Sequence, residues 1–180
     1  MYKSDDPATL EVRRSLTGAM LKLLERVPYD DISVTRLCEA ADVVKRRYFQ
    51  IFQSKEEVLD CCVDDLVDDY AARHGLVVVR SMSDIFRLLF DFFKEFRHDM
   101  RLFVRNGKTF VVKRRCRAFL LDASRVSMEI DALTSGQDAA DLATYVVGGA
   151  ADLLEECLLA DQFSDERADE YVALAERVCA

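Results

Sequence analysis

Residues that break helices and residues that bind metals are both scarce in this chain. Its 180 residues include 6 glycines, 2 prolines and 2 histidines, and no tryptophan. So little glycine and proline, beside many Leu, Ala, Glu, Asp and Arg residues, predicts an all-α protein. No apolar run approaches the roughly 20 residues of a membrane span, and no signal-peptide pattern opens the chain. We therefore expect a soluble, cytoplasmic protein without a membrane segment.

The six cysteines and two histidines show no spacing typical of a metal site or a catalytic centre. No two cysteines form a C-x-x-C pair, and most lie at apolar helical positions, where free cysteine acts as a small hydrophobic residue. His74 and His98 have no Ser, Cys or carboxylate partner in a catalytic pattern. We expect no metal, no other cofactor, no enzymatic activity and a reducing compartment.

Charge is distributed unevenly along the chain, whose net charge is −8. Residues 1–55 contain 10 Lys and Arg against 8 Asp and Glu, whereas residues 56–180 contain 15 against 25. This asymmetry predicts a small cationic DNA-reading domain at residues 1–55 and an acidic helical body at residues 56–180.

A helix-turn-helix is predicted at about residues 33–52. Ser33 can cap a first helix, whose apolar residues follow the spacing of one buried stripe. These apolar residues are Val34, Leu37, Cys38 and Ala41. The second helix begins with three cations, and its apolar side is Tyr48, Ile51 and Phe52. A short helix braced on another, with a basic start facing outward, is the arrangement that enters the major groove of DNA.

Cap and breaker residues predict about nine helices in the whole chain. Outside the helix-turn-helix, the expected spans are residues 7–26, 54–75, 81–96, 99–106, 109–132, 135–160 and 165–179. Capping boxes are expected at Ser54–Glu57, Ser81–Asp84 and Ser135–Asp138. The one β-like run is Val77–Val79, and we expect three residues to be too few for a sheet.

Three segments in the first 60 residues have a familiar order and spacing. They are LLERVPYDDISV at 23–34, LCEAADV at 37–43 and YFQIFQSK at 48–55. This part of the chain resembles the TetR family of transcriptional regulators. The resemblance implies a homodimer with a three-helix DNA-binding domain, followed by a helical domain for dimerisation and ligand. Residues 145–158 look like the penultimate helix of a branch that includes an activator of dihydroxyacetone kinase genes.

The resemblance also implies a set of DNA-binding residues. These are Thr35, Lys45, Arg46, Arg47, Tyr48, Phe49, Gln50 and Lys55. Five positions depart from the family. Val44 stands where a capping Ser or Asn is usual, Arg47 where a Thr that touches phosphate is usual, and Phe49 where a phosphate-binding Tyr is usual. Gln50 and Ile51 stand where basic or His residues are usual, whereas Lys55 is retained. Asp42 is an alternative cap if the second helix begins earlier. Tyr48 is interpreted as core as well as a candidate contact, because so small a domain needs its apolar residues inside.

Two further sets of residues concern the body. Aromatic residues at helical spacing are candidates for lining an apolar ligand pocket, or are simply core: Phe86, Phe90, Phe93, Phe103, Phe110 and Phe119. The dimer interface implied by the family would contain Leu142, Tyr145, Val146, Gly149, Leu153, Cys157, Tyr171, Leu174, Ala175 and Val178. The small residues from Gly148 to Ala151 allow close approach of a helix, either from the same chain or from a partner. The basic run 113–117 is either a solvated helix face or a second DNA surface.

The leading hypothesis is a homodimeric repressor, bound to an inverted repeat in double-stranded DNA and released by a small apolar or aromatic ligand. The alternative is a co-regulator whose DNA-binding head has drifted and which acts through a protein partner. Val44, Phe49 and Ile51 motivate this alternative.

Overall fold

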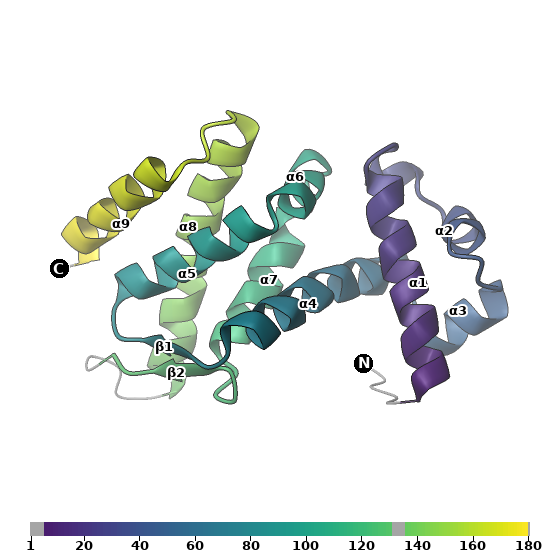
Figure 1. Cartoon of the computed structure of the whole chain (residues 1–180), viewed down its shortest axis with the longest axis horizontal. Coiled ribbons are helices and arrows are strands. Elements are labelled where there is room, and N and C mark those ends of the chain that lie inside the picture. The colour runs from purple at the N-terminus through teal and green to yellow at the C-terminus, as the bar shows by residue number, and fades with distance from the viewer. Residues whose placement is uncertain (1–5, 131–135, 180) are drawn as a thin grey trace. The chain divides into compact units, whose positions relative to one another are not determined.

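Helices make up 76% of the computed structural model, which describes residues 6–130 and 136–179 (Figure 1). The described residues contain nine α-helices and one two-stranded sheet, so the expected all-α class is confirmed. The chain divides into two units, residues 1–65 and 66–180. The boundary lies ten residues beyond the expected one, inside a long helix.

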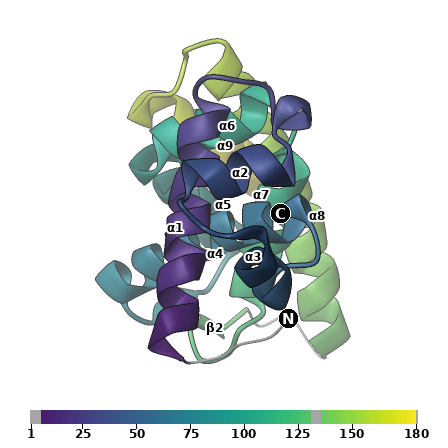
Figure 2. The same cartoon turned by 90° about the vertical axis from the view of Figure 1, so that its right-hand side faces the viewer.

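The first unit is built from α1 (Pro7–Leu24), a 3-10 turn at Tyr29–Asp31, α2 (Val34–Ala40), α3 (Lys45–Ile51) and the start of α4 (Lys55–His74). Helix α1 packs against both α2 and α3 (Figures 1 and 2). The fully buried side chains of this unit are Leu16, Met20, Ile32, Leu37, Tyr48, Val58 and Val63. The first turns of α4 belong to this core, which explains why the boundary falls within that helix.

This later boundary changes the charge of the first unit. The ten added residues contain five carboxylates and no cation, so residues 1–65 carry 10 Lys and Arg against 13 Asp and Glu. The prediction of a cationic domain is therefore wrong for the unit as a whole. Its net charge is −3, and only the start of α3 carries a run of cations.

The second unit contains the rest of α4 and seven further elements. They are β1 (Val77–Val79), α5 (Met82–Glu95), α6 (Arg97–Arg105), α7 (Thr109–Leu120), β2 (Val126–Met128), α8 (Gly136–Leu159) and α9 (Asp165–Cys179). Helix α5 packs on α8 and α9 (Figure 1) and buries four phenylalanines. Charged residues of α5 also pair with α9, such as Arg87 with Asp169 at 3.3 Å.

Helix ends follow local side-chain chemistry. Asp6 caps α1 and Ser33 caps α2, each through a hydrogen bond accepted from a backbone N–H three residues later. Ser81 and Asp84 form the expected capping box of α5. At Ser54 the box differs, because Glu57 accepts from the N–H of Gln53 at 2.8 Å. The expected box at Ser135–Asp138 begins outside the described residues.

Two expectations about the body were wrong. Val77–Val79 does form a strand, which pairs in parallel with Val126–Met128. The helix expected to reach residue 132 ends at Leu120, because Asp122 begins a turn instead. Its side chain accepts from the N–H of Ser124 at 3.0 Å, and its carbonyl accepts from the N–H groups of Arg125 and Val126 at 2.9 Å. That turn frees the following residues to pair with β1.

Among the described residues, no helix combines the length and the apolar character needed to span a bilayer. All five cysteines whose surroundings the structure describes are buried, namely Cys38, Cys61, Cys62, Cys116 and Cys157. Burial raises the pKa of the Cys61 thiol to about 11 and that of the Cys116 thiol to about 12. Because the thiolate is the reactive form, these thiols should be inert at neutral pH.

We predict that the variant Cys179→Ser resists a thiol-specific disulfide reagent at pH 8 while folded. Burial excludes the reagent from all five, and the raised pKa values keep the Cys61 and Cys116 thiols protonated. In denaturant all five remaining thiols should react at once. Mass spectrometry over time counts the labels in both states, and rapid labelling of the folded protein at Cys61 or Cys116 would contradict this packing.

Candidate nucleic-acid interface

The turn between α2 and α3 is closed by the backbone, with Asp42 in the left-handed conformation at φ 53°. The N–H of Val43 donates to the carbonyl of Cys38 at 2.9 Å, and the N–H of Asp42 donates to that of Glu39 at 3.3 Å. This pair of bonds is the Schellman motif, which usually places glycine where Asp42 stands. Asp42 therefore ends α2 and does not cap α3, contrary to the alternative considered from the sequence.

Helix α3 begins at Lys45 and has Val44 as its N-cap residue, without a side-chain cap. Val44 is 72% exposed. A valine side chain cannot accept a hydrogen bond from a backbone N–H, so this end of α3 has no side-chain cap. The helix is held by its packing and by its backbone bonds rather than by its N-cap.

The two faces of α3 are chemically distinct. Tyr48 is 0% exposed and lies inside the first unit with Phe52, whose ring centroid is 5.8 Å from its own. Lys45, Arg46 and Gln50 are exposed, and so is Phe49, at 60%. Residues 45, 46, 49 and 50 follow helical spacing, so they share the outward face.

Tyr48 was a candidate DNA contact, and its complete burial shows that assignment to be wrong. Its hydroxyl has no hydrogen-bond partner among the described residues. Burial raises the pKa of this phenol above its ordinary value. Tyr48 therefore acts as a core residue with a polar atom that costs stability.

Arg47, expected to contact phosphate, instead bonds within the first unit. Its Nη1 donates to Oε1 of Gln50 at 3.1 Å, and its Nη2 donates to Oγ1 of Thr9 at 3.1 Å. The carboxylate of Asp6 lies 3.7 Å from Nη2. The long side chain thus links α3 to the first turn of α1.

Lys55, another basic residue predicted to bind DNA, also bonds within the first unit. Its Nζ donates to the carbonyl of Tyr29 at 3.0 Å and to that of Ile32 at 3.1 Å, and lies 4.2 Å from the centroid of the Tyr29 ring. Two of its three N–H groups are therefore used to hold the α1–α2 connection against the start of α4. Sequence reasoning missed this role, because the two carbonyls belong to a turn more than 20 residues away.

The last candidate, Thr35, is exposed on α2. It lies at the edge of an open hollow of about 320 Å³ beside the α2–α3 turn. The hollow also contains Glu39, Asp42 and Lys45. Its two carboxylates disfavour phosphate there, so the outward face of α3 is the better candidate for contact with DNA.

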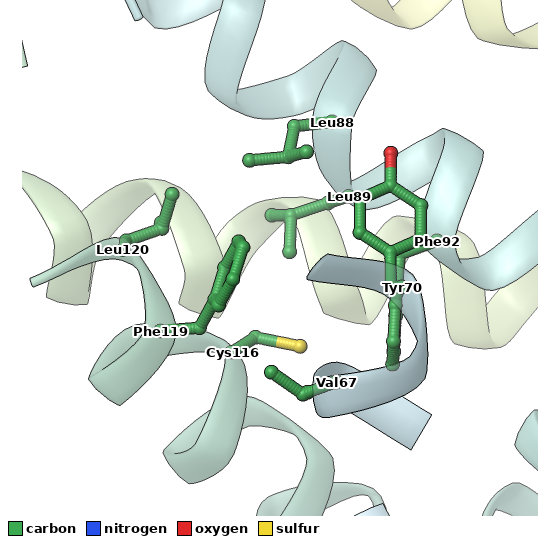
Figure 3. A pocket seen from close by; sticks show the side chains of 8 residues that line it. All are labelled: Val67, Tyr70, Leu88, Leu89, Phe92, Cys116, Phe119 and Leu120. Carbon is green, nitrogen blue, oxygen red and sulfur yellow. The ribbon is translucent and has the colours of Figure 1, made fainter. Parts of the chain in front are cut away.

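The body has a cavity, but the expected aromatic residues do not surround it. Its volume is about 20 Å³, which is room for roughly one water molecule. The lining residues, shown in Figure 3, are Val67, Tyr70, Leu88, Leu89, Phe92, Cys116, Phe119 and Leu120. Of the six expected phenylalanines only Phe119 contributes. The other five do not line this cavity, so a ligand pocket formed by them stays a prediction.

Those five phenylalanines have other surroundings. Phe93 and Phe103 are core residues, Phe86 lies beside Tyr171 at 5.7 Å between ring centroids, and Phe90 stacks on Phe163 at 4.7 Å. Phe110 is exposed. All but Phe110 are therefore buried, as expected if these aromatic residues are simply core.

The residues expected at a dimer interface divide into three groups. Val146 and Cys157 are buried inside their own chain, which removes them from any interface, and Cys157 Sγ lies 3.2 Å from the hydroxyl of Tyr171. The exposed or half-buried members are Leu142, Tyr145, Gly149, Leu153, Tyr171 and Leu174. The side chains of Ala175 and Val178 lie outside the described part of the structure.

Gly148 and Gly149 leave open space on α8. A Cβ added at either position would meet no atom within 4 Å. The explanation that these glycines admit a neighbouring helix of the same chain is therefore wrong. Beside them, Tyr145 is 66% exposed.

The basic run at residues 113–117 is used within the second unit. Lys113 forms an ion pair with Asp152, and Arg117 donates to the hydroxyl of Thr144 at 3.3 Å. Both partners lie on α8. These contacts favour the interpretation as a solvated helix face over a second DNA surface.

No protein-family model matches this chain, and no curated protein matches it in sequence. The described residues also contain no group of three or more His, Cys, Asp or Glu side chains placed to hold a metal ion. The helix-turn-helix geometry and the sequence segments within residues 23–55 are therefore the features that indicate a function.

We predict that Tyr48→Phe is neutral or stabilises the protein by about 1 kcal/mol, because it removes a buried hydroxyl without a partner. Tyr48→Ala should cost roughly 3–5 kcal/mol through the cavity it leaves. Denaturant unfolding of both variants measures the free energies. A loss of more than about 1 kcal/mol in Tyr48→Phe would show that the hydroxyl has a partner after all.

Proposed function

We propose that this protein is a TetR-type, DNA-binding transcriptional regulator that acts as a homodimer in the cytoplasm. The observation that carries the proposal is the outward face of α3. Lys45, Arg46, Phe49 and Gln50 share it, while Tyr48 and Phe52 anchor the other face. An α-helix with its side chains is roughly 10–12 Å in diameter, which matches a major groove about 12 Å wide.

The outward side chains divide into two kinds of DNA contact. Lys45, at the start of α3, suits a phosphate, which supplies affinity without sequence information. Arg46 and Gln50 suit base edges, where a guanidinium or an amide distinguishes one base pair from another. Phe49 adds an exposed apolar ring that can pack on a thymine methyl group.

The proposed dimer partner is a second copy of this chain, docked on the exposed face of α8 and on α9. Open space at Gly148 and Gly149 beside the exposed ring of Tyr145 supports this choice. A two-fold dimer presents two α3 helices, and these would bind half-sites about one helical turn apart, roughly 34 Å. The DNA site would then be an inverted repeat.

The proposed mode of action is repression that a small apolar or aromatic ligand relieves. The apolar cavity beside Tyr70 and Cys116 supports the class of ligand. At about 20 Å³ the cavity must enlarge before it can hold one. Such a ligand would stabilise a minor, more open conformation of the body. It can weaken DNA binding only as far as it binds this open conformation more tightly than the closed one.

A co-regulator that acts through a protein partner remains the second candidate. The charge of −3 on residues 1–65 favours it, since a net negative unit is repelled by DNA. The internal bonds of Arg47 and Lys55 favour it too, because they engage two of the cations predicted to bind DNA.

Selection of bound fragments from random double-stranded DNA with the full-length protein distinguishes the two candidates. Enrichment of an inverted repeat would support the regulator. If no sequence is enriched at moderate salt, the co-regulator becomes the leading hypothesis.

We predict that Lys45→Ala weakens binding to the selected DNA and lowers the slope of log K against log salt by about 1, because one phosphate contact is lost. The loss should be equal on selected and scrambled duplexes. Lys22→Ala, an exposed lysine on α1, is the matched control and should keep the parent slope. Equal slopes for the parent and Lys45→Ala would remove Lys45 from the interface.

We predict that Gly149→Arg abolishes the dimer, since it places a long charged side chain in the proposed contact between α8 helices. The monomer should still fold, because nothing lies within 4 Å of the added Cβ. Gly18→Arg is the control, at a helical glycine of the first unit with equally open surroundings. Sedimentation and circular dichroism should show a folded monomer for Gly149→Arg and a dimer for the control. A stable Gly149→Arg dimer would place the interface elsewhere.

A further inference from the structure

Arg47 lies at the centre of a hydrogen-bonded chain of side chains that joins Gln50 on α3 to Thr9 and Asp6 at the start of α1. Nη1 donates to Gln50 and Nη2 donates to Thr9, both at 3.1 Å. The Thr9 hydroxyl in turn donates to Oδ2 of Asp6 at 2.9 Å, and the N–H of Thr9 donates to the same oxygen at 3.1 Å. The chain therefore runs from the cap of α1 to the outward face of α3.

The direction of each bond in this chain is fixed by chemistry. A guanidinium has five N–H donors and no acceptor, so the atom of Gln50 that faces Arg47 must be the carbonyl oxygen. The hydroxyl of Thr9 has one hydrogen, which Asp6 accepts, so its oxygen is left to accept from Arg47. Exchanging the amide atoms of Gln50 would break the chain.

This direction determines what Gln50 offers to its surroundings. With Oε1 turned toward Arg47, the NH₂ group is the part of the amide that remains for a ligand. A glutamine that reads adenine needs both atoms, one to accept from N6 and one to donate to N7. A glutamine whose carbonyl is turned toward Arg47 presents its NH₂ donors, and these match the acceptors O6 of guanine and O4 of thymine. On adenine they can reach only N7, without the second bond to N6.

We propose that Arg47 is a positioning residue that holds Gln50 by its carbonyl, so that α3 selects a keto base, thymine or guanine, where Gln50 meets the DNA. This inference rests on the proposed DNA-binding function and adds the base class. Thymine ranks first, because Phe49 exposes an apolar ring next to Gln50 and thymine carries a methyl group beside its O4. Cytosine ranks last, since its N4 amino group is a donor and would face the NH₂ donor of Gln50.

The competing role for Arg47 is a phosphate contact, and the geometry opposes it. To reach phosphate, the side chain would give up its bonds to both Thr9 and Gln50 and leave the Asp6 carboxylate 3.7 Å away. These groups are partly exposed, so the bonds contribute orientation more than stability. The expected effect is accordingly moderate, a discrimination of roughly 3- to 10-fold, as for one hydrogen bond.

The test uses the DNA site that the parent protein selects, with each position replaced in turn by the other three base pairs. Gln50→Ala identifies the position that Gln50 reads, because preference disappears there alone. At that position the parent should bind thymine or guanine roughly 3- to 10-fold more tightly than cytosine. Arg47→Met should reduce the preference to less than about 2-fold and improve binding to adenine, with an unchanged salt slope, because the freed amide can then use both atoms. The double variant should match Gln50→Ala.

Variants at Thr9 test the same series of hydrogen bonds from its α1 end. Thr9→Val removes the acceptor for Arg47 and should weaken the preference at the Gln50 position, while Thr9→Ser keeps the hydroxyl and should restore it. Lys45→Met is the matched control for Arg47→Met and should lower the salt slope by about 1 with all base preferences intact. Thermal unfolding of each variant checks that the first unit remains folded.

Three outcomes would overturn the inference. An Arg47→Met variant with a slope lowered by about 1 and intact preferences would make Arg47 a phosphate contact. A preference for adenine in the parent at the Gln50 position would show that the amide is not held by its carbonyl. A parent that enriches no sequence at all would overturn the proposed function, and the inference with it, whereas the first two outcomes leave the proposed function standing.

Discussion

Burial of Tyr48 is the constraint on which the arrangement of the first unit depends. A seven-residue helix has few ways to be held, and α3 has no side-chain cap at Val44. The Tyr48 ring, fully enclosed and in contact with the ring of Phe52, sets the rotation of the helix about its axis. Once that rotation is fixed, helical spacing puts residues 45, 46, 49 and 50 outside and directs Arg47 toward α1.

Two basic residues of this unit form internal hydrogen bonds and so have structural roles. Lys55 and Arg47 each connect segments distant in the sequence, through backbone carbonyls in one case and side-chain oxygens in the other. Only Lys45 and Arg46 remain exposed at the start of α3. The surrounding carboxylates make the unit negative overall, so any DNA binding must depend on a local field within a few ångströms of α3. Salt screens such interactions over about 10 Å at 0.1 M ionic strength.

Local features of this fold could be predicted from the sequence, and long-range ones could not. Ser33 and Ser81 mark helix starts through backbone N–H groups three residues away, and both caps were predicted correctly. The hydrogen bond from Arg47 to Thr9 joins residues 38 positions apart, and no pattern in either segment predicts it. The same holds for the strand that pairs with Val77–Val79, since a parallel partner can lie anywhere along the chain. Aromatic spacing predicted burial of most phenylalanines, but not which of them would border a cavity.

The small cavity bears directly on how a ligand would regulate such a protein. Its walls come from α4, α5 and α7, and Val67 and Tyr70 of α4 form one side (Figure 3). Tyr70 is tightly placed, because its ring stacks on that of His74 at 4.2 Å and meets that of Phe92 at 5.7 Å. A ligand larger than water must therefore displace side chains of α4, α5 or α7, and the first turns of α4 belong to the core of residues 1–65. Helices move as units more readily than they bend, so α4 is the element through which a proposed ligand would act on α3. Opening this packed site costs free energy, which lowers the apparent affinity of the ligand. The ligand must therefore bind the open state tightly enough to offset that cost.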